Sequence, residues 1–169
     1  MENPNPHKSK PYLANRDFLK KLKAKSPKDL DDNFRKLDTE VFKEIDCLDC
    51  GNCCKTTSPI FIDTDVDRIA KHLKMSPAAF SEKYLRTDED NFQVLKTAPC
   101  SFLGDDNYCH IYEQRPRACR EYPHTNRKRM SQILDLTLEN TIVCPAVDQI
   151  VQKLKAIYPV EKNLSGRFQ

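Results

Sequence analysis

Four cysteines stand within eight residues of this chain, in the run C-L-D-C-G-N-C-C over residues 47–54. They are Cys47, Cys50, Cys53 and Cys54. The other four are scattered through the second half of the chain: Cys100, Cys109, Cys119 and Cys144. Thiolate sulfur is a soft ligand for zinc and iron, and the C-x2-C-x2-C spacing brings three sulfurs to one side of a tight loop. The run therefore predicts a metal centre, and the fold has to bring the distant cysteines to it.

The composition leaves room for one domain with a modest core. Of the 169 residues, 38% are hydrophobic and 31% are charged, and there is no Trp. Apolar burial alone is thin at this length, so metal cross-links between distant segments would add folding free energy. The net charge of +3 is a mild excess, which by itself indicates neither a nucleic-acid nor a membrane partner.

The first residues, M-E-N-P-N-P-H-K, lack the apolar stretch of a secretory signal, and no run reaches the roughly 18 apolar residues of a membrane span. We therefore expect a cytoplasmic protein that crosses no membrane. Disulfides are rare in that reducing compartment, where clustered cysteines more often bind metal. Cys53 and Cys54 could join each other only in a strained ring, which also argues against a disulfide framework.

Hydrophobic spacing and capping signals predict a chain rich in helices. The longest expected helix covers residues 27–45, with Ser26 as its N-cap and Pro27 at its first position. Other helices are expected over 15–25, from Thr64 to Leu73, from Pro77 to Leu85 and from Pro145 to Ile157, with a helical turn near 113–120. Short strands are expected over 59–62, 92–96 and 133–138.

The expected fold class is α+β, in a small helix-rich single domain whose irregular loops and short strands surround a multi-cysteine metal site. We expect a flexible N-terminal tail over 1–12 and N-terminal helices over 13–46. The cysteine-cluster metal-binding domain is expected over 47–158, followed by a C-terminal tail over 159–169.

The adjacent pair Cys53 and Cys54 constrains the kind of centre. Neighbouring Cα atoms lie only about 3.8 Å apart and their side chains tend to diverge, which makes the pair awkward on one tetrahedral ion. Two neighbouring ions, or different atoms of one polynuclear cluster, are easier to reach. Eight thiolates suffice for two four-cysteine zinc sites or two four-cysteine iron–sulfur clusters. The C-x2-C-x2-C run matches the start of the bacterial ferredoxin run, which leans the identity toward iron–sulfur.

Three blocks of the sequence resemble a known family. The first is the run over residues 47–54, the second is P-C-S-F-L-G-D-D-N-Y-C-H-I-Y-E-Q-R-P-R-A-C-R-E-Y-P over 99–123, and the third is Cys144-Pro145. Over about residues 45–155 the chain resembles the YkgJ-like CxxCxxCC family of cysteine-cluster proteins, described as zinc- or iron-chelating domains. The resemblance implies a metal-chelating domain with all eight cysteines as candidate ligands. Flagellin lysine methylases are similar in their cysteine pattern, within a larger protein.

Three arginines surround one of the downstream cysteines: Arg115, Arg117 and Arg120, around Cys119. Their guanidinium groups could offset the negative charge of the thiolates, bind an anionic cofactor or substrate beside the metal, or lie on the surface as solvated charges. The basic run over 127–129 lacks an accompanying aromatic platform, so nucleic-acid binding is disfavoured.

Three functions are consistent with these features. The first is a metal-binding protein that coordinates an iron–sulfur cluster or zinc through eight cysteines. The second is a metal-dependent enzyme that modifies a protein or RNA, with a substrate held by the segment 115–120. The third is a structural zinc module for interactions with a protein or small-molecule partner. No Gly-rich phosphate loop and no Ser/His/Asp arrangement can be argued from the spacing, so the sequence assigns no catalytic residue.

Overall fold

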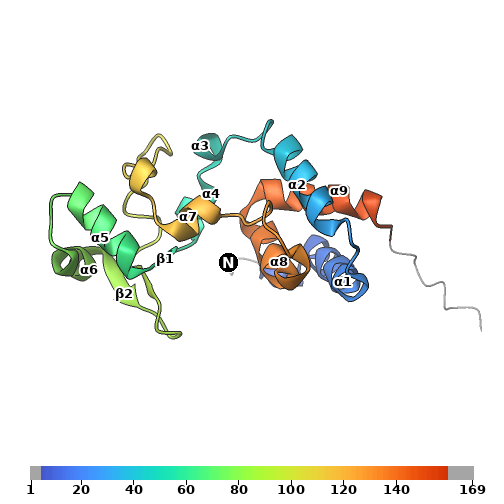
Figure 1. The fold of residues 1–169 in the computed structure, drawn as a ribbon, viewed down its shortest axis with the longest axis horizontal. Helices are drawn as coiled ribbons and strands as arrows, with labels where there is room; N and C mark the ends of the chain where they lie inside the picture. Colours follow the sequence, from blue (N-terminus) through green and yellow to red (C-terminus); the bar gives the residue numbers. More distant parts are fainter. Residues whose placement is uncertain (1–4, 160–169) are drawn as a thin grey trace, which may run out of the picture. The chain divides into compact units, whose positions relative to one another are not determined.

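The computed structural model describes residues 5–159 and divides the chain into two units. The first, which we call the helical unit, takes the described residues up to Glu44 and those from Thr125 onward. The second, which we call the sheet unit, is Ile45–His124 and carries seven of the eight cysteines. In Figure 1 the helical unit is blue and orange to red, and the sheet unit runs from cyan to yellow-orange.

Four α-helices and two 3-10 helices build the helical unit. They are η1 (Pro6–Lys8), α1 (Lys10–Lys25), α2 (Leu30–Val41), η3 (Met130–Gln132), α8 (Leu134–Val143) and α9 (Pro145–Ile157). Helix α1 packs on α8, α2 packs on α9, and α8 packs on α9. Helix α2 shows why the sequence folds this way, because its apolar residues recur three and four positions apart and all of them are buried: Leu30, Phe34, Leu37 and Val41.

Helix α1 begins five residues earlier than the predicted start at residue 15. Ser9 is its N-cap, and the Ser9 hydroxyl accepts a hydrogen bond from the N–H of Tyr12 (3.3 Å). At its other end, Ser26 adopts a left-handed conformation and ends α1 rather than capping the next helix. The predicted helix over 27–45 is correspondingly shorter, and is observed as Leu30–Val41.

The strand predicted over 133–138 is wrong, because these residues form the start of α8. The segment I-L-D-L-T-L alternates apolar and polar residues, which is typical of a strand. Leu134, Thr137 and Leu138 also lie three and four positions apart, and all three are buried. Packing against α1 and α9 therefore decides in favour of the helix.

The sheet unit consists of short elements around a three-stranded antiparallel sheet. They are α3 (Cys47–Cys50), α4 (Asn52–Thr56), β1 (Ile60–Phe61), α5 (Asp63–His72), α6 (Pro77–Tyr84), β2 (Leu85–Thr87), β3 (Gln93–Leu95), η2 (Tyr112–Gln114) and α7 (Arg117–Glu121). The strand order is β1-β3-β2, with Phe61 opposite Gln93 and Leu85 opposite Leu95. Helix α5 packs against α6, and Phe80 lies in the core between the rings of Phe61 and Phe102.

The predicted strands near 59–62 and 92–96 are present as β1 and β3. Strand β2 was not predicted, because Leu85 was placed at the end of the preceding helix, whereas it leaves α6 in an extended conformation and pairs with β3. The expected helical turn near 113–120 is η2 followed by α7. The helix-rich α+β class is confirmed, and the tail predicted over 159–169 lies, beyond Pro159, outside the described residues.

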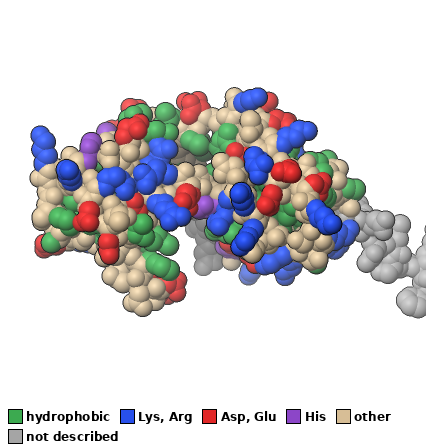
Figure 2. All heavy atoms as spheres, viewed as in Figure 1, with side chains coloured by type: hydrophobic (Ala, Val, Ile, Leu, Met, Phe, Trp, Pro, Cys, Tyr) green, Lys and Arg blue, Asp and Glu red, His purple; other side chains and the backbone are tan. Residues whose placement is uncertain are grey.

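None of the helices that the structure describes has the length and apolar character needed to cross a membrane. On the face shown in Figure 2, Lys and Arg side chains are interspersed with Asp and Glu. This distribution fits the mild net charge of +3 and gives no uniformly basic surface on that face.

Candidate metal centre

The cysteine run folds into two short helices joined at Gly51. Asp46 caps α3 by accepting a hydrogen bond from the N–H of Leu48 (2.8 Å). Gly51 ends α3 with a φ of +54°, and its N–H donates to the carbonyl of Cys47 (2.8 Å). Glycine reaches this left-handed conformation without the steric cost that a Cβ imposes. The turn at Gly51 therefore places Cys47 and Cys50 on one helix and the adjacent pair on the next.

Two contacts tie this loop to the downstream cysteine segment. The N–H of Cys100 donates to the carbonyl of Cys54 (2.8 Å). The side-chain amide of Asn107 donates to the carbonyl of Asp49 (3.1 Å), and its Oδ1 would lie 3.0 Å from a Cβ built on Gly51. Residues about fifty positions apart are thus held together by one backbone hydrogen bond and one side-chain hydrogen bond to the backbone.

The sulfur atoms of Cys53 and Cys54 lie 4.0 Å apart, so the two adjacent side chains do not diverge as the sequence suggested. Two sulfurs on one tetrahedral zinc, each about 2.3 Å from the ion, are separated by roughly 3.8 Å. The observed separation is close to that value. The pair therefore fits two ligands of the same metal atom.

Cys54 is the electrostatic centre of the group. A hydrogen bond from Cys53, helped by the charge of Lys55, lowers the pKa of the Cys54 thiol to about 7. The same hydrogen bond, with burial, raises the pKa of Cys53. Negative charge on Cys54 also contributes to raising the pKa values of Cys100, Cys109 and Cys119. The charge of Cys54 therefore acts on four other thiols of the sheet unit.

Burial is the main cause of the raised pKa values at the three downstream cysteines of the sheet unit. It raises the pKa of Cys100 to about 11 and that of Cys119 to about 12, and it raises the pKa of Cys109 as well. Thiols in such surroundings stay protonated near neutral pH, since the thiolate would be poorly solvated. A bound metal cation would displace these protons and compensate the charge.

The remaining three cysteines occupy different surroundings. Cys47 is exposed and its charge contributes to the raised pKa of Cys53, whereas Cys50 is half-buried and its carbonyl accepts a hydrogen bond from Lys55 Nζ (3.2 Å). Cys144 belongs to the helical unit, where it is the residue before Pro145 and the N-cap of α9, as the sequence predicts.

Cysteine thiolates are suitable ligands for a soft metal such as zinc or iron, but the cysteine side chains do not converge on a single point. Over residues 5–159, no three His, Cys, Asp or Glu side chains form a group that could hold a metal ion as they stand. The sulfur pair of Cys53 and Cys54, 4.0 Å apart, has the separation expected of two ligands on one metal atom.

The three predicted arginines separate into two kinds. The guanidinium of Arg115 lies over the ring of Tyr112 (3.7 Å to the centroid), and its charge partly offsets the burial-driven rise in the pKa values of Cys109 and Cys119. Arg117 Nε instead pairs with the carboxylate of Glu121 at 2.6 Å, and Arg120 is exposed on α7. The charge of Arg115 thus acts on those two cysteines.

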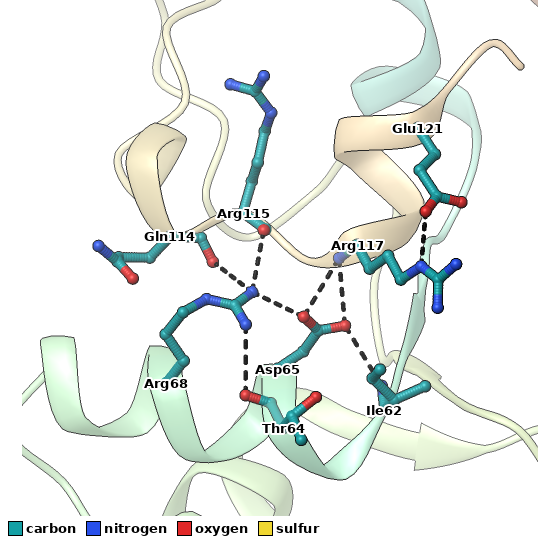
Figure 3. Close-up of polar contacts among 8 residues, drawn as sticks. All are labelled: Ile62, Thr64, Asp65, Arg68, Gln114, Arg115, Arg117 and Glu121. Atoms are coloured by element: carbon teal, nitrogen blue, oxygen red, sulfur yellow. Dashed lines mark hydrogen bonds and ion pairs between the residues drawn. The ribbon is translucent and has the colours of Figure 1, made fainter. Parts of the chain in front are cut away.

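A buried ion pair beside this segment was missed by the sequence analysis. Asp65 is 1% exposed and its carboxylate pairs with Arg68 at 2.6 Å, one turn further along α5 (Figure 3). In the sequence, Asp65 is visible only as a charged residue next to the apolar positions Val66 and Ile69 of the same helix. Surface helices show many such residues, so the pattern alone does not mark this one.

Comparison with known protein families decides the affiliation. The sequence profile of the CxxCxxCC family, described as "Putative zinc- or iron-chelating domain", matches residues 46–145. The chain belongs to the CxxCxxCC family. Searches of curated proteins and of solved structures found no match. The CxxCxxCC match covers the whole sheet unit except Ile45 and extends to Pro145, so it includes all eight cysteines.

The left-handed turn of the CxxCxxCC loop gives a first prediction. Gly51→Ala should lower the free energy of unfolding by about 1–2 kcal/mol, because an L-residue is strained at this φ. The added Cβ would also press on the Asn107 side chain. Urea-induced unfolding of the purified protein measures the change. Gly104→Ala is the control, since Gly104 has no left-handed φ and its Cβ would meet only side-chain ends. A cost no greater than that of the control would contradict the role of the turn.

Proposed function

We propose that this protein binds zinc or iron through its cysteine thiolates, with Cys54 at the middle of the site. The observation that carries the proposal is the pair of sulfurs 4.0 Å apart at Cys53 and Cys54, together with the half-buried thiols of Cys100, Cys109 and Cys119. Membership of a family described as zinc- or iron-chelating supports the same function. Cys47, Cys50 and Cys144 complete the ligand set that the sequence pattern proposes.

The sulfur separation narrows the kinds of centre that we propose. A pair 4.0 Å apart suits a metal atom that takes two cysteine ligands. A four-cysteine zinc ion meets that condition, and so does each iron of a four-cysteine [2Fe–2S] cluster. A [4Fe–4S] cluster held by four cysteines gives each iron a single thiolate, so it suits the pair less well. The ferredoxin-like spacing is typical of [4Fe–4S] proteins, so the lean toward iron–sulfur now rests on a [2Fe–2S] cluster, and zinc is proposed on an equal footing.

Each kind of centre would supply a different chemistry. Zinc would cross-link the loops and stabilise the folded sheet unit, whereas an iron–sulfur cluster would supply electron transfer. In both cases the protein side chains perform the same work. They present the sulfurs, exclude part of the water by burial, and provide the positive charge of Arg115 near Cys109 and Cys119.

Metal analysis of protein purified without oxygen tests this function. We expect bound metal in the native protein, with acid-labile sulfide and a brown colour for an iron–sulfur cluster, or a colourless zinc protein without sulfide. Cys54→Ser should reduce the metal content strongly, since the Cys54 sulfur lies 4.0 Å from that of Cys53 and its carbonyl accepts the N–H of Cys100. Cys47→Ser, at an exposed position, should cost less. A folded wild-type protein that contains no metal and takes up none would contradict the proposal.

A second candidate function is a metal-dependent enzyme that acts on a protein or RNA. The observation that favours it is the position of Arg115, beside the exposed ring of Tyr112 and within electrostatic reach of Cys109 and Cys119. A guanidinium in that place could hold an anionic substrate group next to the centre. The same position equally suits a positive charge that stabilises the thiolate-rich site. We propose this stabilising role for Arg115, rather than substrate binding.

Substitution of Arg115 separates the two roles. If its charge stabilises the centre, Arg115→Ala should weaken metal retention by about tenfold, in the range seen for groups that support metal ligands. Competition with a chelator measures the retention. Arg117→Ala is the matched control, because the Arg117 guanidinium pairs with Glu121 on the exposed side of α7. Unchanged metal retention in Arg115→Ala would overturn the charge-compensating role and favour the substrate-binding one.

A further inference from the structure

Two side chains of α5 fasten the chain segment that connects Cys109 to Cys119. Asp65 is 1% exposed and lies in the first turn of the helix. Both of its carboxylate oxygens accept a hydrogen bond from the backbone N–H of Arg117 (3.2 Å each), and Oδ1 also accepts from Arg68 Nη2 (2.6 Å). Figure 3 shows the carboxylate between the Arg68 guanidinium and the start of α7.

Arg68 also forms hydrogen bonds with the backbone of the residues just before α7. Its Nη2 donates to the backbone carbonyls of Gln114 (3.3 Å) and Arg115 (3.1 Å), while Nη1 donates to the carbonyl of Thr64 (3.3 Å). Three backbone groups within residues 114–117 are therefore bound by two side chains. In Figure 3 the side chain of Arg115 points away from this network, so Arg68 contacts only the backbone of Arg115.

Backbone hydrogen bonds link residues 114–117 to the cysteines on either side, and on the side of Cys109 the N–H of Arg115 donates to the carbonyl of Tyr112 (3.3 Å). The N–H of Tyr112 donates to the carbonyl of Cys109 (3.0 Å), and the N–H of Cys119 donates to the carbonyl of Pro116 (3.0 Å). The helix that carries Cys119 has only five residues, and isolated helices of that length are unstable in water. The placement of Cys119 therefore depends on contacts from outside its own helix, and the Asp65–Arg68 pair supplies them.

The charges of the pair also suit a site built from thiolates. Asp65 and Arg68 together are neutral, so they fix the segment without adding net charge beside the sulfurs. A buried carboxylate is stable only while its partners remain, and loss of one partner leaves an uncompensated charge. Removal of either side chain should therefore release residues 114–117 rather than let them resettle in the same position.

We propose that Asp65 and Arg68 are positioning residues for the metal centre, which hold residues 114–117 so that Cys109 and Cys119 reach the same centre. The proposal rests on the proposed metal-binding function. It assigns the pair a role in the geometry of the ligands, through hydrogen bonds to the backbone, although neither residue is itself a ligand. Groups that orient metal ligands in this way commonly change metal affinity by about 10- to 100-fold when they are removed.

The test compares Asp65→Asn with Asp67→Asn, an exposed Asp in the same helix, in the metal-loaded full-length protein. Asp65→Asn should release its metal to a chelator about 10- to 100-fold faster than the control. Arg68→Lys retains the charge for Asp65 but lacks the planar fork that reaches two carbonyls, so it should fold and still release metal faster than the control. Release from both variants within about twofold of the control, where RT ln 2 is well under 1 kcal/mol, would overturn the proposal.

A second readout needs no metal. In the metal-free protein, mass spectrometry after alkylation with iodoacetamide reports how often each thiol becomes accessible. Asp65→Asn should raise the alkylation rate of Cys119 about tenfold, as expected for a lost buried charge-assisted hydrogen bond, while that of Cys50 stays unchanged. An unchanged rate at Cys119 would overturn the positioning role even if the metal were lost. Conversely, a wild-type protein without metal would refute the proposed function, and the rate at Cys119 would still decide whether the pair holds the segment.

Discussion

The loop over residues 47–54 and the segment over 100–119 meet at one backbone hydrogen bond, from the N–H of Cys100 to the carbonyl of Cys54 (2.8 Å). Both segments consist of short helices and turns that have little regular structure of their own to hold them. A few specific ties therefore decide where the thiols lie. The amide of Asn107 on the Asp49 carbonyl supports the first segment, and the Asp65–Arg68 pair supports the second.

These contacts explain how a small apolar core supports a site that contains so many cysteine sulfurs. The apolar core of the sheet unit, around Phe80 and Ile69, holds α5 and α6 on the sheet, and α5 in turn presents Asp65 and Arg68. Burial raises the pKa values of the half-buried thiols of Cys100, Cys109 and Cys119, which would be protonated without a cation. Metal binding would replace these protons and stabilise the folded state. The loops themselves bury too little apolar surface to provide that stabilisation.

Sequence reasoning succeeded where the local signal is strong and failed where distant residues decide. The helix within residues 27–45 and the strands near 59–62 and 92–96 could be predicted, since each depends on a few neighbouring residues. The segment 133–138 alternates like a strand, yet packing against α1 and α9 makes it a helix. Asp65 could not be singled out, because its partner N–H at Arg117 is 52 residues away in the sequence. The convergence of the Cys53 and Cys54 sulfurs was likewise invisible, because it depends on the fold of α4.

The proposed function requires that cysteine sulfur binds the metal. X-ray absorption at the zinc or iron edge of the purified protein tests it most directly, because the technique reports which atoms surround the metal. The account predicts a first shell dominated by sulfur, at about 2.3 Å for zinc. A first shell of nitrogen or oxygen alone, at about 2.0–2.2 Å, would contradict it.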